Sequence, residues 1–394
     1  MGYIVPGEGQ IENLYVTDSW LVEQFAGDRL WAWGLNGNGQ LGDNTTVNKS
    51  SPVQTVASGT NWKQVSGGTL FAAGVKTDGS LWGWGFNSSG QLGTNTVVSP
   101  SSPVQTSLGG TNWKQVACGV AFTSVIKTDG TLWSYGTGTI GQLGDGTIVS
   151  KSSPVQTIAV GTNWKQVSCG SVHAAAIKTD GTLWTWGNNS NGQLGDSTIA
   201  HKSSPIQTTA GGTNWKQVSC GSVHAAAIKT DGTLWTWGNN SNGQLGDNTT
   251  VFKSSPIQTT AGGTNWKQVA CGNGITGGIK TDGTLWNWGN NLAGQLGDNT
   301  LTQRNTPIQT VAGGTNWKNI GIGSSASSNT SAVKTDGTLW IWGLNTNGQL
   351  GNNSTTNISS PIQTIAGGTN WKSVCTGSAT YAISINNINT TGVE

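Results

Sequence analysis

Hydrophobic residues occur in short runs separated by glycine, asparagine, serine and threonine, and the same order of runs returns along most of the chain. Between residues 163 and 208 the runs are Trp164–Cys169, Ala174–Lys178, Leu183–Trp186 and Pro205–Thr208. Each run has four to six residues, a length typical of strands and too short for most helices. We therefore predict four strands in each unit.

The residues between the runs predict antiparallel pairing. Asp180-Gly181 separates the second and third runs, and Asp-Gly between two strands is a strong hairpin signal. Trp184 and Trp186 are two residues apart, so they should lie on one face of the third strand. Pro205 suits an outer strand, where a missing backbone donor is tolerated. The aspartates that open the same turn elsewhere are Asp78, Asp129, Asp231, Asp282 and Asp336.

The unit repeats seven times with a nearly constant period. GQLG begins at positions 39, 90, 141, 192, 243, 294 and 348, so the spacing is 51 residues five times and then 54. The three additional residues lie within Ser324–Ser331, between two predicted strands. Seven units account for 360 of the 394 residues, which leaves no room for a second domain.

The two terminal units are incomplete in complementary ways. The first contains Trp20–Phe25, Leu30–Gly34 and Pro52–Val56, whereas the last contains Trp371–Cys375 and Tyr381–Ile385. A solenoid would need atypical capping repeats instead. We therefore predict an all-β fold, a seven-bladed β-propeller of four-stranded antiparallel blades. C-terminal strands should close the ring by joining the N-terminal blade, and Trp20–Phe25 and Tyr381–Ile385 both qualify as its second strand.

We expect the propeller to occupy residues 19–386, after a segment (residues 1–18) that anchors or docks it and before a tail (residues 387–394). The first sixteen residues have neither a basic nor an apolar region of the kind found in secretion signals, so we expect no signal peptide. No apolar run approaches the roughly 20 residues that a membrane span needs. The compartment stays open, with a virus particle or a cell surface as candidates.

Composition supports this organisation. The chain has 61 glycines and 21 tryptophans, and 20 of the tryptophans stand at repeated positions in NWK and LWxWG, which we assign to the buried scaffold. Only 9% of residues are charged and the net charge is +2, so charge gives no reason to expect nucleic acid as a partner.

No pattern of catalytic, metal-ligating or cofactor-binding residues emerges. His173 and His224 stand where earlier units have Phe71 and Phe122, so we expect them to fill a packing slot. The sequence at positions 37–42 reads G-x-G-x-x-G but opens no helix, which argues against a nucleotide cofactor. The cysteines have no zinc spacing and are expected to be buried thiols: Cys118, Cys169, Cys220, Cys271 and Cys375. The aspartates after GQLG are expected to shape turns: Asp43, Asp145, Asp196, Asp247 and Asp298.

The unit V-x-C-G, D-G-x-L-W-x-W-G, N-x-x-G-Q-L-G resembles the regulator of chromosome condensation repeat. The resemblance covers residues 19–386 and implies a seven-bladed propeller. The opening stretch from Asn13 to Gly34 also resembles near-identical-repeat proteins of bacteria and marine bacteriophages. Members of the repeat family serve as GTPase exchange factors, ubiquitin-ligase modules, a plant ultraviolet-B photoreceptor and a β-lactamase inhibitor. No functional residue carries over from the exchange factors, whose insertion is not found beyond the three residues near Ser324, or from the photoreceptor, since the only arginines, Arg29 and Arg304, do not adjoin a tryptophan. The inhibitor presents loop residues from one propeller face, a mode this sequence could use.

Specificity is expected where the repeats differ. One set of apolar residues follows the WG pair: Leu35, Phe86, Ile140, Leu292 and Leu344. A second set lies in the loop after GQLG: Val47, Val97, Ile148, Ile199, Val251, Phe252 and Leu301. His201 stands in the same loop. The simplest expectation is that these side chains pack against the next blade, and the alternative is an apolar, Asn/Thr-rich face that binds a protein or a glycan.

These patterns favour a non-catalytic binding or structural module without cofactor or metal. Our preferred version is a component of a virus particle or bacterial surface that contacts a protein partner or a cell-surface receptor, with residues 1–18 joining an assembly neighbour. Two other classes remain: an exchange factor for a small GTPase, and a lectin that binds glycans through exposed tryptophans.

Overall fold

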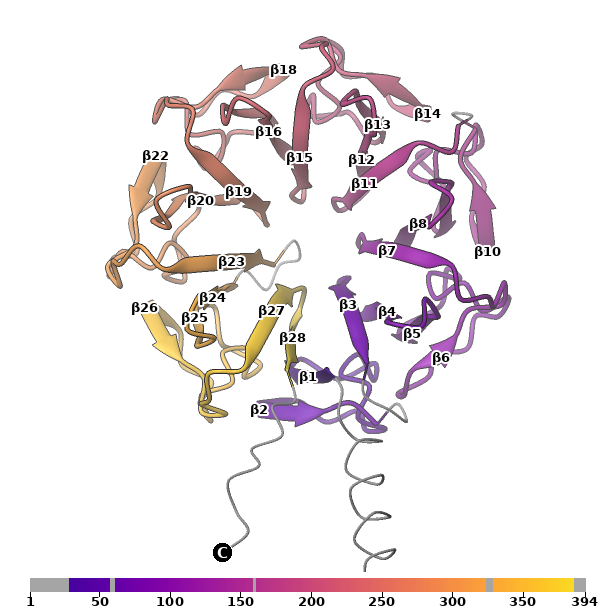
Figure 1. Cartoon of the computed structure of the whole chain (residues 1–394), viewed down its shortest axis with the longest axis horizontal. Helices are drawn as coiled ribbons and strands as arrows, with labels where there is room; N and C mark the ends of the chain where they lie inside the picture. Colours follow the sequence, from indigo (N-terminus) through magenta and orange to yellow (C-terminus); the bar gives the residue numbers. More distant parts are fainter. Residues whose placement is uncertain (1–27, 57–60, 159–160, 324–328, 386–394) are drawn as a thin grey trace, which may run out of the picture.

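In the computed structural model, seven four-stranded antiparallel sheets form a ring of blades, as the sequence predicts (Figure 1). The structure describes residues 28–56, 61–158, 161–323 and 329–385. The segment 1–18, the run Trp20–Phe25 and the tail 387–394 lie outside these ranges. Throughout the described part of the chain the regular elements are strands.

Strands from both ends of the described part of the chain build one blade, which we name the closing blade. It contains β27 (Trp371–Thr376), β28 (Ala379–Ser384), β1 (Arg29–Gly34) and β2 (Lys49–Gln54), in the spatial order β2-β1-β28-β27. The second strand of this blade is therefore β28, which resolves the choice that the sequence left open. Trp31 Nε1 donates to Ser384 Oγ at 3.0 Å across the joint, and Lys372 forms an ion pair with Asp28.

The other six blades each use four consecutive strands. The first two contain β3 (Trp62–Gly67), β4 (Phe71–Lys76), β5 (Leu81–Gly85), β6 (Val104–Gln105), and then β7 (Trp113–Cys118), β8 (Phe122–Lys127), β9 (Leu132–Gly136), β10 (Lys151–Gln156). The two near-identical blades contain β11 (Trp164–Cys169), β12 (His173–Lys178), β13 (Leu183–Gly187), β14 (Lys202–Gln207), and then β15 (Trp215–Cys220), β16 (His224–Lys229), β17 (Leu234–Gly238), β18 (Lys253–Gln258). The last two contain β19 (Trp266–Cys271), β20 (Ile275–Lys280), β21 (Leu285–Gly289), β22 (Arg304–Gln309), and then β23 (Trp317–Ile322), β24 (Asn329–Lys334), β25 (Leu339–Gly343), β26 (Ile358–Gln363).

The strand bounds agree closely with the sequence pattern except at the outer strand. That strand, β14 in its unit, spans Lys202–Gln207 and so begins three residues before Pro205. The proline lies on the outermost strand, as expected, because the sheet order is β11-β12-β13-β14. The polar residues Lys202–Ser204 gave no strand signal, since an outer strand is paired on one side only and need not be apolar.

Tryptophans hold neighbouring blades together. Trp164 and Trp186 lie on one face of their blade and pack against Ile126, Leu132 and Leu143 of the preceding blade. Their ring centroids are 6.3 Å apart with an interplanar angle of 62°, an edge-to-face arrangement that aromatic pairs favour. Six blades contain this tryptophan pair, and in the seventh Tyr135 joins Trp113 in the same packing, so the core of the protein lies between blades.

The GQLG motif accepts a hydrogen bond from a tryptophan of the next blade. Trp186 Nε1 donates to the backbone oxygen of Gln142 at 3.0 Å, and Trp33 donates to Gln349 at 2.8 Å across the closure of the ring. Gly144, which ends the motif, has a φ of +69°, and a Cβ there would lie 2.9 Å from Trp186 Nε1. The repeated glycine is therefore required by both its backbone conformation and the approach of the indole.

Glutamine side chains add a second contact between blades. Gln166 Nε2 donates to the backbone oxygen of Val218 at 3.1 Å, and its Oε1 accepts from the backbone nitrogen of Val218 at 3.1 Å. The amide thus pairs with a backbone edge as another strand would. Gln64, Gln115 and Gln217 make the same pair of bonds to Val116, Val167 and Val269.

Candidate functional site

Each blade presents two different ends. Because the four strands are antiparallel, the loop joining the third and fourth strands, such as residues 188–201, lies at one end, which we name the long-loop face. The Asp-Gly hairpins and the loops that lead to the next blade lie at the opposite end, which we name the hairpin face. Both sets of candidate residues from the sequence belong to the long-loop face.

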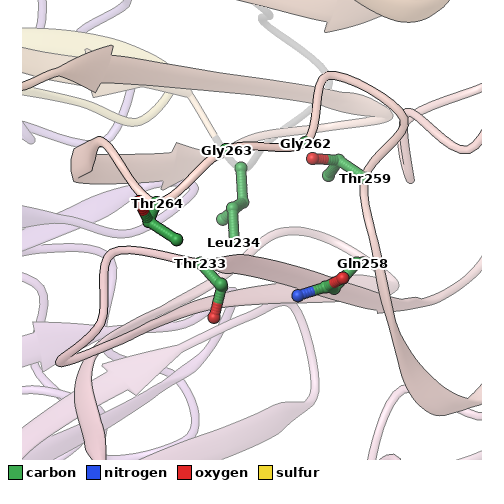
Figure 2. Close-up of a pocket in the computed structure, with 7 residues that line it drawn as sticks. All are labelled: Thr233, Leu234, Gln258, Thr259, Gly262, Gly263 and Thr264. Carbon is green, nitrogen blue, oxygen red and sulfur yellow. The ribbon is translucent and has the colours of Figure 1, made fainter.

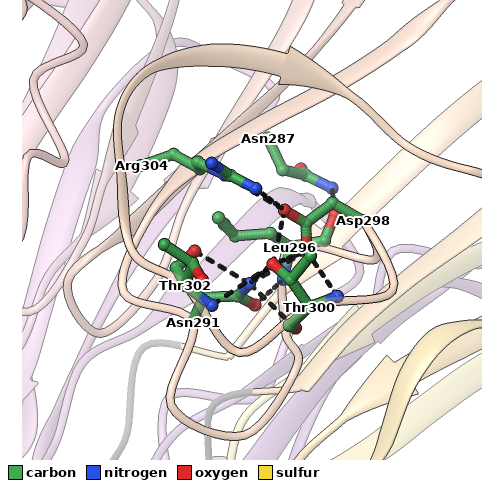
Figure 3. A network of polar contacts seen from close by, with 7 residues as sticks. All are labelled: Asn287, Asn291, Leu296, Asp298, Thr300, Thr302 and Arg304. Atoms are coloured by element: carbon green, nitrogen blue, oxygen red, sulfur yellow. Dashed lines mark hydrogen bonds and ion pairs between the residues drawn. The ribbon is translucent and has the colours of Figure 1, made fainter.

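In six blades an asparagine at the base of the long loop fixes the conformation of that loop, and Gly138 takes its place in the seventh. Figure 3 shows the network in the blade that contains β21 and β22. Asn291 Nδ2 donates to Asp298 Oδ1, to the backbone oxygen of Thr300 and to that of Thr302, each at 3.0 Å. Its Oδ1 accepts from the backbone nitrogen of Leu296 at 2.9 Å. One buried side chain therefore holds four points of the loop, so the loop tip is supported by a rigid base.

The aspartate in this network is also committed to structure. Asp298 accepts from Thr300 and from Arg304, whose Nε and Nη2 lie 3.1 and 3.0 Å from Asp298 Oδ2. Burial opposes ionisation of Asp298, but the hydrogen bonds from Thr300, Arg304 and Asn291 outweigh it and hold its pKa below the usual value. The turn role predicted for this aspartate is confirmed.

The aspartate and its cation are replaced together. Four other blades pair Asp43 with Lys49, Asp145 with Lys151, Asp196 with Lys202 and Asp247 with Lys253, at 3.6–4.0 Å. The blades on either side of the closing blade have Thr94 with Pro100 and Asn352 with Ile358 instead. The aspartate and its lysine or arginine are absent together in these two blades, which indicates that each aspartate stabilises only its own loop. Within the described ranges no three His, Cys, Asp or Glu residues gather as a metal site would require.

The first set of candidate residues occupies three different positions in the loop. Leu35, Phe86 and Leu344 directly follow the glycine of WG and are partly buried. Ile140 is the fourth residue after that glycine and is also partly buried. Leu292 is the third and is 77% exposed. The structure therefore separates Leu292 from the other four, which contribute to the base of the loops.

The second set projects into solvent. Val47, Val97, Ile148, Ile199, Val251, Phe252 and Leu301 are between 52% and 66% exposed. The expectation that they pack against the next blade is wrong for these residues. Val98 and Val149, which the sequence analysis missed, are 70% and 57% exposed beside them. We name these nine residues together with Leu292 the apolar rim.

Shallow depressions lie beside the apolar rim. One of about 280 Å³ is lined by Val98, Pro100 and Val104, and another of about 360 Å³ by Val251, Phe252 and Ile257. Apolar tips next to apolar depressions form a surface that can receive a partner's side chains.

His201 has a structural role. Its Nδ1 accepts from the backbone nitrogen of Asn189 at 3.0 Å. Asn48 and Asn357 use their Oδ1 atoms for the same bond to Asn36 and Asn345, both at 2.8 Å. Ser99 and Ser150 accept the same bond in two further blades, so an asparagine, a histidine or a serine fills one loop-capping position, an equivalence that no sequence pattern revealed.

His173 and His224 are fully buried, which confirms the predicted packing slot. Burial lowers the pKa of His173 to about 4 and that of His224 to about 3, with His173 contributing to the second shift. His224 Nε2 lies 2.9 Å from Thr276 Oγ1, which itself donates to the backbone oxygen of Gln244. The His224 imidazole must therefore donate from Nε2. The lowered pKa values keep both histidines neutral at pH 7.

The hairpin face carries a repeated cluster of lysine and tryptophan. Lys178 Nζ lies 4.9 and 4.6 Å from the ring centroids of Trp164 and Trp184. Trp184 is only partly buried, contrary to the expectation for the scaffold tryptophans, and its Nε1 donates to Thr182 Oγ1 at 2.9 Å. Lys178 and the hydroxyl of Thr182 thus already contact the half-exposed indole of Trp184. The other indoles at this position, also partly buried, are Trp31, Trp82, Trp133, Trp235, Trp286 and Trp340.

Comparisons with known proteins place this ring in a family. The model for the RCC1-like domain matches residues 146–388, and the model for the regulator of chromosome condensation (RCC1) repeat matches residues 28–75 and 78–126. The ultraviolet-B receptor UVR8 of Arabidopsis thaliana is 33% identical over 251 residues, which is 63% of this chain and 57% of the receptor. The chain thus spans little more than half the length of that relative.

Solved structures share the fold. Human WBSCR16 has a TM-score of 0.80 with 23% identity over 92% of this chain and 100% of its own. Yeast RCC1 (Prp20), solved bound to Kap60, also has a TM-score of 0.80, with 18% identity over 93% of this chain and 91% of its own.

No helix among the described residues is long and apolar enough to cross a membrane.

Proposed function

The chain belongs to the family of RCC1-like domains, and we propose that it is a non-catalytic binding module that holds a protein partner on its long-loop face. The observation that carries this proposal is the apolar rim. Exposed apolar residues clustered on one face are typical of protein interaction sites. The likeness to yeast RCC1, a propeller solved in complex with the protein Kap60, supports the same class of function.

The loops beneath the apolar rim suit this role because they are fixed before any partner arrives. In six blades an asparagine holds the base of the long loop, as Asn36 and Asn291 do through hydrogen bonds of 2.9–3.1 Å. Binding through such loops costs little ordering entropy, so more of the free energy of burying the apolar tips contributes to affinity.

Site-specific photo-crosslinking tests the proposal. A photoreactive amino acid at Val149, on the apolar rim, should crosslink to a partner protein in the native host, and one at Thr179, on the hairpin face, should not. The partner is then purified and titrated against a variant with Val97, Val98, Ile148 and Val149 replaced by threonine. The chain supplies the precedent, since Thr355 and Thr356 stand at the corresponding positions of one blade. We expect affinity to fall at least tenfold, and unchanged affinity would refute the proposal.

The geometry gives less support to the two other classes of function, a lectin and an exchange factor. A lectin that stacks sugars on tryptophan needs a free indole face, whereas lysines lie over the half-exposed indoles in six blades. An exchange factor should accelerate nucleotide release from a small GTPase, and a release assay against candidate GTPases tests that function directly.

We propose further that the module belongs to a virus particle or a bacterial surface, with residues 1–18 as a docking arm for an assembly neighbour. What supports this is the sequence alone: a short segment without the repeat precedes a chain built almost entirely of one unit. Deletion of residues 1–18 should leave a folded propeller that no longer co-purifies with the assembly. Continued co-purification would contradict the docking role.

A further inference from the structure

One lysine in each blade lies outside the strand ladder at the inner edge of the ring. In β11 the residues on both sides of Lys165 pair with consecutive residues of β12, Lys178 and Ile177. Lys165 is therefore the extra residue of a β-bulge, a device that re-aims a side chain. The same break in register recurs in the first strand of every blade, and the extra residue is a lysine each time. We name these seven residues the lysine ring: Lys63, Lys114, Lys165, Lys216, Lys267, Lys318 and Lys372.

The lysine ring surrounds the axis of the propeller on the hairpin face. The strands that carry it are the innermost ones, and they encircle the centre of the molecule in Figure 1. Each lysine is the second residue of its strand, which begins on the hairpin face, and all seven side chains are exposed. Neighbouring inner strands are bonded directly to each other, as Gln115 of β7 is to the backbone of Val167 in β11. Seven cations therefore stand on adjacent strands around one axis.

The positive charge of the lysine ring is almost uncompensated. Lys372 pairs with Asp28, and within the described ranges the other six lysines form no ion pair. A second lysine of this face, such as Lys178, has an aspartate two residues away in the same hairpin that offsets its charge. On the long-loop face each described aspartate has its own lysine or arginine. The small net charge of the chain thus hides a concentration of positive charge at one end of the axis.

The lysine of the bulge is retained more strictly than the residues around it. The next position, which contacts the neighbouring blade, contains five glutamines, Asn319 and Ser373. The aspartate–cation pairs of the long-loop face are absent from two blades. Repulsion among seven like charges around one axis opposes closure of the ring. Retention of lysine in all seven blades therefore indicates that the lysines act together on an anion.

We propose that the lysine ring binds a compact molecule that carries several phosphate groups on one small scaffold, centred on the axis of the propeller. Cations that surround one point match a compact polyanion better than an extended one. A lysine ammonium is a point charge with three rotatable donors, which suits the oxygens of a phosphate group, whereas planar carboxylates are matched best by arginine.

The rest of the hairpin face favours this ligand over a nucleic acid. Proteins that bind single strands stack the bases on free aromatic faces, whereas lysines already lie over six of the half-exposed indoles here.

A pocket on the same face does not suit an anion. It lies between the start of β17, the end of β18 and the loop that leads to β19 (Figure 2), and its volume is about 230 Å³. Its walls are uncharged, so they cannot compensate the desolvation of a phosphate: Thr233, Leu234, Gln258, Thr259 and the stretch 262–264. The lysine ring is therefore the anion site of this face. It is separate from the apolar rim, so failure of either proposal leaves the other intact.

Isothermal titration calorimetry with the full chain tests the site. The salt concentration is about 0.15 M, at which charges more than about 8 Å apart are largely screened. Inositol hexakisphosphate is the probe, inorganic phosphate is the control for a single phosphate group, and citrate is the control for clustered carboxylates. The probe should bind at one site per chain and more tightly than either control.

Two variants that each lose four positive charges separate the lysine ring from general electrostatics. Replacement of four ring lysines by glutamine should weaken binding of the probe at least tenfold: Lys114, Lys165, Lys216 and Lys267. The matched control replaces four lysines of the long-loop face by glutamine and should leave the affinity nearly unchanged: Lys49, Lys151, Lys202 and Lys253. Vesicles that contain a phosphorylated inositol lipid distinguish the sources, since binding to them indicates a lipid headgroup and binding of the free probe alone indicates a soluble ligand.

A co-crystal of the wild-type chain with the probe decides the matter if a variant does not fold. Its phosphate groups should lie within hydrogen-bond distance of Nζ atoms of the lysine ring. Equal loss of affinity in the two variants, several probe molecules bound per chain, no binding, or a probe bound only away from the axis would each overturn the proposal. Tighter binding of citrate or of a short DNA duplex than of the probe would overturn it as well.

Discussion

The buried histidines should make the propeller sensitive to mild acid. His173 and His224 occupy the slot that holds Phe71 and Phe122 in other blades, and both are fully buried. We therefore choose the double variant His173→Phe, His224→Phe, which places in two blades the residue that the chain already uses in two others. Within the described ranges neither ring nitrogen of His173 makes a hydrogen bond of standard geometry, whereas His224→Phe removes the hydrogen bond with Thr276, a loss that is the same at every pH.

The size of the effect follows from the two pKa values. In the folded chain these are about 4 for His173 and about 3 for His224, against 6.5 for an unperturbed histidine. Below pH 6.5 the unfolded chain therefore binds protons that the folded chain excludes, so stability is lost as the pH falls towards 4. At about 1.4 kcal/mol per pH unit and per histidine, the two together should remove about 5 kcal/mol between pH 7 and pH 4.5.

Denaturant unfolding at pH 7, 5.5 and 4.5, followed by tryptophan fluorescence, measures this loss. The wild-type midpoint should fall steeply over that range, whereas the midpoint of the double variant should fall only slightly. The range lies above the pH at which carboxylates with lowered pKa values become protonated, so the aspartates contribute little. If the double variant loses as much stability as the wild type between pH 7 and 4.5, the reasoning from burial is refuted.

Three further substitutions test the contacts between blades, each by thermal or denaturant unfolding. Tyr135 takes the place of a tryptophan and its buried hydroxyl has no hydrogen bond to the residues that the structure describes, so Tyr135→Phe should leave stability unchanged or raise it by about 1 kcal/mol; a clear loss would reveal a missing partner. Gly144→Ala should destabilise by at least about 2 kcal/mol, because alanine is strained at positive φ and its Cβ meets Trp186; a neutral result would contradict the packing of GQLG. Gln166→Ala should cost about 1–3 kcal/mol by unpairing the backbone of Val218, and Gln166→Glu should also destabilise, because its second carboxylate oxygen would face the Val218 backbone oxygen without a proton between them.

The repeat made most of the fold predictable. A fixed period, Asp-Gly turns and paired tryptophans specify the order of strands, and complementary ends specify a ring. The ends of the outer strand were harder to predict, since Lys202–Ser204 pair on one side only and have no apolar signal. The second strand of the closing blade could not be chosen either, because Trp20–Phe25 and Tyr381–Ile385 have the same pattern and only tertiary packing distinguishes them.

The candidate site was harder to predict because exposure depends on single positions within a loop. Leu35 and Leu292 both follow a WG pair, yet a shift of two positions takes the side chain from partly buried to 77% exposed. Likewise, the apolar body of Trp184 suggested full burial, whereas Lys178 covers its outer face. The repeat period predicts which strands pair, but it does not predict how close two particular side chains lie, such as Lys178 and Trp184.

The closing blade also has a consequence for synthesis of the protein. β1 leaves the ribosome before its ladder partner β28, which follows some 350 residues later, since Trp31 pairs with Ala382. Until then Leu30 and Trp33, both fully buried in the ring, lack the surfaces that cover them. At about 5–20 residues per second, this interval lasts on the order of half a minute. The nascent chain therefore carries an unpaired, apolar strand edge for that time, and chaperones that bind such edges should affect its yield more than its final stability.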